Sequence, residues 1–259
     1  MEKTFSTIQD VLAFFGVTNT TLTPDEKRSL DEDGFVIFYD FIPPDLLQRM
    51  RDVFEELMDR EGSDAGKEFR QEVGARRLAN LVNKDPVFDV CYTHPKMLAV
   101  AYHVIGREFK LHSINGRDAL PGEGHQPLHA DWGPRKQNEP FHVVNTIWLL
   151  DDFTLENGAT RLVPKTHLLA GSPRDYVADL WGPHPDEIVV IAPAGAVIAY
   201  NAHLWHGGTL NRTSGSKRIV LHPAFVARES PQQQNQRDLL LKKTYDRLLP
   251  AAHYLLDVK

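Results

Sequence analysis

Two histidines and an aspartate are the residues of this 259-residue chain whose types and spacing could do chemistry. His129 and Asp131 are two positions apart, so on an extended segment both side chains point to the same face. An imidazole beside a carboxylate supplies two ligands suited to a transition metal. His206 follows much later in the chain, within the run Leu204–Gly208. If His206 folds back beside the first pair, two histidines and one carboxylate hold one face of an iron(II) ion and leave its opposite face open.

The His-x-Asp pair is weak evidence by itself, because histidine and aspartate occur this close together in many sequences. One alternative is that His129 is a core histidine hydrogen-bonded to Asp131 at the end of a strand. Another is zinc, although zinc usually takes a fourth protein ligand or leaves a single water site. His203 competes with His206 for the third ligand position, and the Trp-His-Gly-Gly setting favours His206.

Composition and charge limit the class of protein to which these residues belong. A hydrophobic share of 42% is enough to form a core and excludes global disorder. The single cysteine, Cys91, excludes an intramolecular disulfide framework and sites built from several thiolates. The formal net charge of −6 argues against nucleic acid as the main partner. Neither a signal-peptide pattern nor the ~20 apolar residues of a membrane span is present, so we expect a cytoplasmic protein with no membrane partner.

The elements that must position the metal ligands fall into a helical first part and a β-rich second part. Helices are expected over residues 23–34, from Pro43 onward, and over Pro95–Ile105, because capping residues or prolines open them. Phe35–Tyr39 reads as a short buried strand, and the polar stretch Glu61–Arg77 as a loop or lid. From Glu108 onward, short β-rich runs alternate with turn residues: Phe109–Asn115, Val143–Leu150, Ala159–Val163, Ile188–Ile191, Ala196–Tyr200 and Arg218–Ala227.

Regular short strands separated by turn residues favour an antiparallel sandwich or jelly roll over a parallel sheet. Gln236–Leu256 is expected to form a C-terminal helix. The sequence contains no repeat and no low-complexity linker. We therefore expect a single domain over residues 1–259, with a helix-rich part (1–107), a jelly-roll core (108–228) and a C-terminal helical part (229–259).

Several ordered motifs accompany the His-x-Asp pair. They are His129–Asp131, Asn145–Phe153, Glu156–His167, and Trp205–Gly208 followed by Asn211, Thr213 and Arg218, with Asp33–Ile37 and Arg77–Leu81 on the N-terminal side. Together they resemble the phytanoyl-CoA dioxygenase family of iron(II)- and 2-oxoglutarate-dependent oxygenases. The resemblance covers about residues 22 to 227, and several motifs in order are more specific than any one of them.

The resemblance implies a double-stranded β-helix (a cupin-like jelly roll) with helices packed on one sheet. It implies that His129, Asp131 and His206 bind iron(II), and that a basic residue soon after His206 binds the distal carboxylate of 2-oxoglutarate. Lys217 and Arg218 both stand there, and on a strand only one of them can point inward. We favour Arg218, because its planar guanidinium suits a bidentate contact with a carboxylate.

Gln126 and Thr160 are similar to cosubstrate contacts of the family. The resemblance also implies that Trp148 packs near the cosubstrate and that Asn211 orders the turn after His206, and we group all four with the cosubstrate site. Each also has a structural interpretation, since Gln126 could cap a turn, Trp148 could be ordinary core and Asn211 could simply favour a turn. The resemblance places His167 in a structural loop position, where Lys165 departs from a glycine common in the family. We interpret His112, His142 and His222 as strand histidines rather than ligands.

The function implied is a dioxygenase that uses iron(II), 2-oxoglutarate and O2 to hydroxylate or otherwise oxidise a C–H bond, with release of succinate and CO2. The intact carboxylate of Asp131 favours oxidation over halogenation, because related halogenases have a small residue there. The alternatives are a non-catalytic jelly-roll binding protein and a zinc-dependent protein of the same fold. We expect a small-molecule metabolite or natural product as substrate, contacted by Glu61–Arg77, Trp132–Phe141 or Asp175–Pro185.

Overall fold

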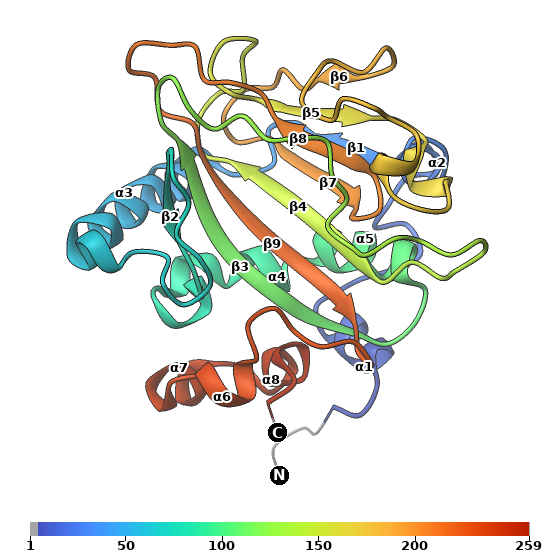
Figure 1. The fold of residues 1–259 in the computed structure, drawn as a ribbon. Helices are drawn as coiled ribbons and strands as arrows, with labels where there is room; N and C mark the ends of the chain where they lie inside the picture. The colour runs from blue at the N-terminus through green and yellow to red at the C-terminus, as the bar shows by residue number, and fades with distance from the viewer. Residues whose placement is uncertain (1–4, 259) are drawn as a thin grey trace.

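Two antiparallel sheets stack on each other at the centre of the structure, a computed structural model that describes residues 5–258 (Figure 1). The larger sheet has six strands in the order β1-β7-β4-β9-β3-β2, and the smaller has three in the order β6-β5-β8. The strands are β1 (Phe35–Phe38), β2 (Ala75–Leu78), β3 (Phe109–Ala119), β4 (Val143–Leu149), β5 (Thr160–Val163), β6 (Ile188–Val189), β7 (Val197–Asn201), β8 (Trp205–Gly208) and β9 (Ile219–Ala227).

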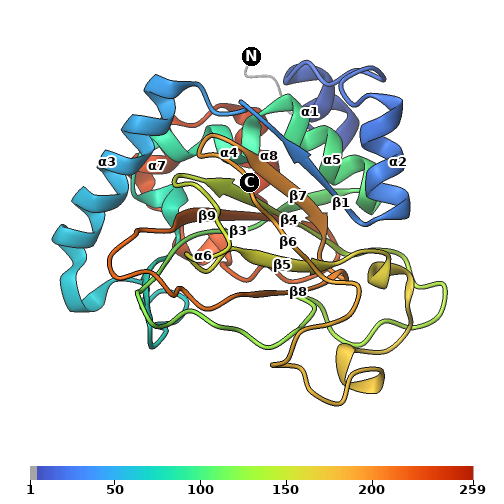
Figure 2. The same cartoon turned by 90° about the horizontal axis from the view of Figure 1, so that it is seen from above.

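Helices cover the outer face of the larger sheet, on the side away from β5, β6 and β8 (Figure 2). They are α1 (Ile8–Phe14), α2 (Pro24–Glu32), α3 (Pro44–Glu61), α4 (Val90–Thr93), α5 (Pro95–Ile105), α6 (Gln236–Leu239), α7 (Lys242–Arg247) and α8 (Pro250–Leu256), with short 3-10 turns between some of them. The central helix α5 is rich in buried apolar residues and ends at Gly106, whose left-handed conformation stops the helix. None of the described helices has the length and apolar character needed to cross a membrane.

Side-chain alternation along β4 separates two hydrophobic layers. Val144 and Trp148 belong to the core between the larger sheet and the helices. Ile147 and Leu149 point the other way and belong to the core between the two sheets. Because successive residues of a strand face opposite sides, the apolar residues of this one strand serve both layers. The functional cavity lies within the second layer, between the sheets.

The expected jelly-roll fold with flanking helices is confirmed, although the two sheets do not close into a barrel. The helix predicted over Pro95–Ile105 has those bounds in the structure. Helices α1 and α4, strand β8, and strand β2 within the stretch expected to be a loop were not anticipated. The β2 sequence Ala-Arg-Arg-Leu lacks an apolar pattern, because its arginines bind carboxylates on both sides of this edge strand.

The prediction of one long C-terminal helix over Gln236–Leu256 is wrong. The segment forms three short helices, with extended backbone at Leu240 and again at Leu248 and Leu249. Pro250 explains the last break, because the residue before a proline is driven out of helical conformation and Pro250 then opens α8. The leucines of this segment suggested one continuous helix, whereas the backbone is interrupted twice.

Candidate metal and 2-oxoglutarate site

A cavity of about 220 Å³ lies between the two sheets and holds most of the predicted site residues. Strands β3, β4, β7 and β9 line it on one side, while β5, β8 and the segment before β4 line it on the other. The lining residues predicted from the sequence are His129, Asp131, His206, Arg218, Gln126 and Thr160.

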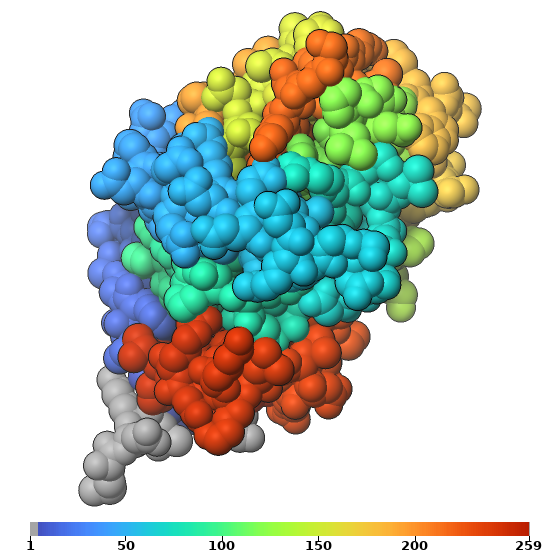
Figure 3. All heavy atoms as spheres, turned by 90° about the vertical axis from the view of Figure 1, so that its left-hand side faces the viewer, coloured from blue at the N-terminus to red at the C-terminus, as the bar shows by residue number. Residues whose placement is uncertain are grey.

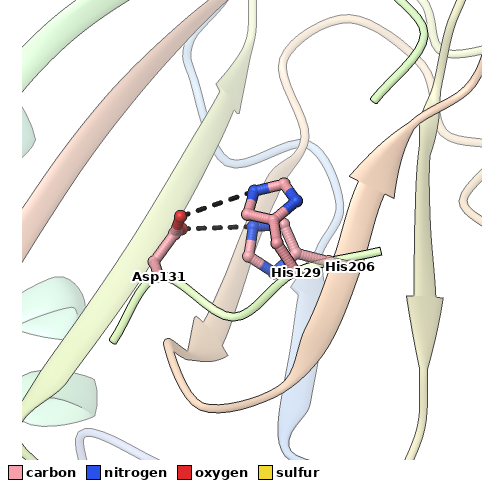
Figure 4. Close-up of side chains that lie close together, drawn as sticks. All are labelled: His129, Asp131 and His206. Atoms are coloured by element: carbon pink, nitrogen blue, oxygen red, sulfur yellow. Dashed lines mark ion pairs between the residues drawn. The ribbon is translucent and has the colours of Figure 1, made fainter. Parts of the chain in front are cut away.

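His129, Asp131 and His206 converge at one end of this cavity (Figure 4). Nε2 of His206 lies 3.1 Å from Oδ2 of Asp131, and Nε2 of His129 lies 3.6 Å from Oδ1. One ligand atom from each residue lies within 4.8 Å of the others. These three are the one group of three or more candidate metal-binding side chains found among residues 5–258. The spacing that suggested a metal site in the sequence therefore corresponds to a real cluster of ligand atoms.

Backbone pairing brings the distant His206 to the His-x-Asp segment. His129 and His206 form an isolated antiparallel bridge in which each backbone N–H donates to the other carbonyl oxygen at 2.9 Å. The next residue, Gly207, runs so close to the chain that a Cβ atom there would lie 2.9 Å from the carbonyl oxygen of Gln126 and 3.0 Å from that of Pro127. The glycine of the Trp-His-Gly-Gly motif is thus required by this close approach.

In both ligand histidines Nδ1 carries the hydrogen, which leaves Nε2 available to bind a metal. Nδ1 of His129 donates to the carbonyl oxygen of Pro127 at 2.8 Å, and Nδ1 of His206 donates to that of Leu204 at 2.9 Å. A carbonyl oxygen can only accept, so Nδ1 carries the hydrogen in each ring. The lone pair of each neutral ring then lies on Nε2, which faces Asp131.

The three groups also perturb one another electrostatically. Burial opposes ionisation of Asp131, but the neighbouring His206 and His129 outweigh it and lower the pKa of this carboxyl. Burial likewise opposes the charge on His206, and Asp131 reverses the effect and raises the pKa of His206. Burial, followed by the proximity of His206, lowers the pKa of His129. Such a set of donors, one anionic and two neutral, fits a divalent transition metal.

Two residues of the larger sheet, which were not assigned a role from the sequence, orient Asp131. Nδ2 of Asn145 on β4 donates a hydrogen bond to Oδ2 of Asp131, and the hydroxyl of Tyr200 on β7 donates to the same oxygen at 3.3 Å. Both residues line the cavity. The signal that could have identified Asn145 is its position in an otherwise apolar strand, two residues before the inward-facing Ile147.

Arg218, and not Lys217, enters the cavity. Arg218 is 2% exposed, and within the described part of the chain its Nε and Nη1 atoms have no hydrogen-bond partner. Lys217 is exposed and pairs with Glu55 at 2.6 Å on the outside. Burial, with a further contribution from the nearby Arg117, lowers the pKa of Arg218 to about 9. A buried guanidinium without a partner is costly, so its free N–H groups fit an anionic ligand.

Gln126 and Thr160 line the same cavity as Arg218, whereas Trp148 and Asn211 do not. Trp148 faces the helical layer, where its ring contacts Phe41 at a centroid distance of 5.4 Å. Its position on β4 alternates with the inward-facing residues, so it cannot reach the cavity. The structure therefore corrects the expectation that Trp148 contacts the cosubstrate.

Asn211 is fully buried in the turn after β8, outside the cavity. Its Nδ2 donates to the carbonyl oxygen of Ala119 at 2.9 Å, and its Oδ1 accepts from the backbone and hydroxyl of Thr213. All of these contacts fix the turn after His206, which is the role expected for Asn211, although it does not line the cavity with the cosubstrate residues among which it was grouped.

The remaining histidines have separate environments. His203 lies outside the cavity, with its ring near Phe141 and His142, and burial lowers its pKa to about 4. His167 is buried against Asp31, where its Nε2 donates to the carbonyl oxygen at 3.2 Å. His112 and His222 line the cavity. Lys165, where the family often has glycine, adopts a left-handed conformation with φ of 71°.

Comparison with known proteins places the chain among dioxygenases. Residues 30–219 match the family model described as "Phytanoyl-CoA dioxygenase (PhyH)". The curated protein "Dioxygenase trt7" of Aspergillus terreus is 30% identical over 213 residues, which cover 76% of this chain and 72% of that protein. The residues matched by the family model include His129, Asp131, His206 and Arg218.

Solved structures share the fold at lower sequence identity. HygX from Streptomyces hygroscopicus, crystallised with nickel and 2-oxoglutarate, has a TM-score of 0.68 at 16% identity and covers 85% of this chain and 94% of its own. EctD from S. alaskensis, crystallised with bound Fe, has a TM-score of 0.69 at 18% identity and covers 83% of this chain and 82% of its own. At these identities the likeness establishes the architecture.

Proposed function

The chain belongs to the phytanoyl-CoA dioxygenase family of iron(II)- and 2-oxoglutarate-dependent oxygenases, and we propose that it hydroxylates a C–H bond of a small-molecule substrate. The observation that carries the proposal is the convergence of His129, Asp131 and His206 beside the partnerless guanidinium of Arg218. HygX has also been crystallised with hygromycin B, which supports a small molecule as the class of substrate.

In this proposal His129, Asp131 and His206 hold iron(II) through Nε2, a carboxylate oxygen and Nε2. The Nδ1 hydrogen bonds to Pro127 and Leu204 keep both imidazoles in the ligating tautomer. Asn145 and Tyr200 hold the Asp131 carboxylate in place through hydrogen bonds to Oδ2. When bound, the iron supplies the activation of O2, coupled to oxidative decarboxylation of 2-oxoglutarate to succinate and CO2.

The remaining cavity residues position the cosubstrate and the substrate. Arg218 binds the distal carboxylate of 2-oxoglutarate, because its buried guanidinium offers donors that no described residue accepts from. Thr160 and Gln126 line the same cavity as Arg218 and the ligand cluster, and in this proposal their polar groups contact the same molecule. The cavity between the two sheets would position the C–H bond next to the metal, and it is open to an incoming substrate at the cluster, where the side chains of His129 and Asp131 are each 35% exposed. The intact Asp131 carboxylate supports hydroxylation over halogenation.

Metal and cosubstrate binding test the proposal before any substrate is known. Anaerobic addition of iron(II) and 2-oxoglutarate to the wild-type chain is expected to produce the visible charge-transfer band of the chelate. Succinate release then serves to screen small molecules. His129→Ala and Asp131→Ala should lose both signals, whereas His203→Ala, which removes a buried histidine outside the cluster, should keep them. Succinate release that persists in Asp131→Ala contradicts the ligand assignment.

A further inference from the structure

Only one of the three segments expected to contact substrate reaches the cavity within the described chain. Phe69, Arg70 and Arg77 of the stretch 61–77 line it, while residues 132–141 and 175–185 contribute nothing to its wall. In Figure 3 the cyan segment after α3 lies on the surface next to the light-green segment that precedes the metal ligands. Gly74 accordingly lies against the side chain of Glu123. The stretch 61–77 therefore forms the wall of the cavity on this side.

Both arginines of this wall have guanidinium N–H groups that donate to no described residue. Arg70 is exposed, and no described residue accepts a hydrogen bond from it or forms an ion pair with it. Arg77 is 7% exposed, and its side chain makes one hydrogen bond in the described structure, from Nη1 to Glu72 at 3.0 Å. Glu72 is shared, because Arg117 also donates to it at 2.7 Å. One carboxylate thus faces two guanidinium groups, and Arg70 adds a further positive charge.

The other anions of the cavity cannot neutralise this wall. Asp131 faces the two ligand histidines, and the distal carboxylate of 2-oxoglutarate is assigned to Arg218. By contrast, Arg135 lies on a segment that stays outside the cavity, and its Nη1 and Nη2 atoms already donate to the carbonyl oxygens of Leu168 and Glu139, while its Nε has no partner among the described residues. Positive charge in excess of the available carboxylate is therefore concentrated at Arg77, which shares Glu72 with Arg117, and at Arg70, whose guanidinium lies over the Phe69 ring at 5.4 Å from its centroid.

We propose that the substrate is a carboxylic acid whose carboxylate binds Arg70 and Arg77, with an apolar portion against Phe69. The inference rests on the proposed function and deepens it by naming the class of substrate. A planar guanidinium binds a carboxylate through two parallel hydrogen bonds, and two such groups at one wall fix both the position and the direction of the acid. Phe69, half-buried beside Arg70, supplies the adjoining apolar surface.

Matched acids and amides test the proposal by binding alone. The probes are benzoate, 3-phenylpropanoate and decanoate, each paired with its primary amide, and their affinities are measured by ligand-observed NMR. The chain is loaded with zinc(II) and saturating 2-oxoglutarate, so that the metal is redox-inert and Arg218 is occupied. At least one acid is expected to bind about tenfold or more tightly than its amide, as charge-assisted hydrogen bonds require.

Arg70→Ala and Arg77→Ala are each expected to reduce this preference severalfold, and Arg174→Ala, at an exposed arginine away from the cavity, should keep it. Circular dichroism and retained 2-oxoglutarate binding show that each variant is folded. Acids that bind no better than their amides, or a preference that survives in both variants, overturn the inference while 2-oxoglutarate binding stands. Failure of the wild-type chain to bind 2-oxoglutarate overturns the proposed function itself.

Discussion

Adjacent basic residues before β9 have opposite environments. Lys217 points outward to Glu55, while Arg218 is buried with its Cζ atom 4.8 Å from the ring centroid of Phe153. The backbone N–H of Arg218 donates to Asp118 at 2.8 Å, which holds the residue at the entrance to the strand. The choice between the two residues, open in the sequence, follows from which side of the sheet each faces.

Arg218→Ala should weaken 2-oxoglutarate binding by about 10- to 100-fold, because charge-assisted hydrogen bonds contribute about 1.5–3 kcal/mol. Lys217→Ala should leave the affinity unchanged, since that side chain lies outside the cavity. Titration of 2-oxoglutarate into the zinc-loaded chain measures both. Equal losses in the two variants would contradict the assignment of Arg218.

Gly207→Ala should weaken metal binding although residue 207 supplies no ligand. The added Cβ would lie 2.9 Å from a backbone oxygen of the segment that carries His129, so that strand and segment must separate. Metal affinity, measured by competition with a chelator, is expected to fall, and 2-oxoglutarate binding with it. Gly215→Ala, at a glycine whose Cβ meets no atom within 4 Å, is the control and should bind metal normally.

At the same scale, spacing and residue type suggested His129, Asp131 and His206 as metal ligands, the ordered motifs of the family resemblance strengthened that prediction, and the structure brings the three side chains together. Spacing and residue type were not enough for Asn145 and Tyr200, whose contacts with Asp131 arise only when β4 and β7 pair. Trp148, by contrast, was placed near the cosubstrate from the sequence although its side chain faces away from the cavity. It lies in the right motif, but strand alternation turns its ring toward the helices.

At the scale of elements, the carboxylate of Glu55 links helix α3, strand β2 and the segment before β9. From α3 it accepts two hydrogen bonds from Arg76 on β2 and one from Lys217 before β9. Hydrogen bonding to Arg76, opposed by burial and assisted by Lys217, lowers the pKa of Glu55 from 4.5 to about 2. A carboxyl with a lowered pKa in the folded state stabilises the fold above pH 4.5 and loses this contribution as the pH falls toward 2.

Glu55→Gln should therefore lower the free energy of unfolding at neutral pH. The difference in this free energy between the variant and the wild type should become smaller as the pH is lowered to about 4. The effect is modest, because the carboxylate is partly exposed to solvent. Urea unfolding at both pH values measures it. Glu56→Gln, at an exposed neighbour on the same helix, is the control. A stability difference between Glu55→Gln and the wild type that grows at low pH would contradict the predicted pH dependence.

Prediction of elements succeeded where one local signal dominates. Proline and glycine bound α5 at both ends, and apolar runs marked β4 and β7 to within a residue or two. Strand β2 was missed because its two arginines carry no apolar pattern. Arg76 is held by Glu55 on α3 and Arg77 by Glu72, and neither ion pair can be predicted from the local sequence. The C-terminal segment was misjudged because leucine spacing outweighed the break at Pro250.

At the scale of the whole molecule, one hydrophobic core links both ends of the chain. Residues of α1, α3, α5 and α8 pack together with β3, β4 and β9 in a single cluster. The helix-rich part, the larger sheet and the C-terminal part thus share buried surface. This continuity supports the prediction of a single domain over residues 1–259, which unfolding can test.

Leu255→Ala should destabilise the entire chain by about 2–5 kcal/mol, since Leu255 is fully buried in that core and the substitution leaves a cavity. Far-ultraviolet circular dichroism reports the helices, and the fluorescence of Trp205, read in a background in which the other three tryptophans are replaced by phenylalanine, reports the smaller sheet. In a single domain both signals shift together in urea. Leu249→Ala, 54% exposed just before α8, should change stability by about 0.5 kcal/mol or less. If Leu255→Ala shifts the helical signal and leaves the fluorescence transition in place, the two layers unfold independently and the single-domain prediction fails.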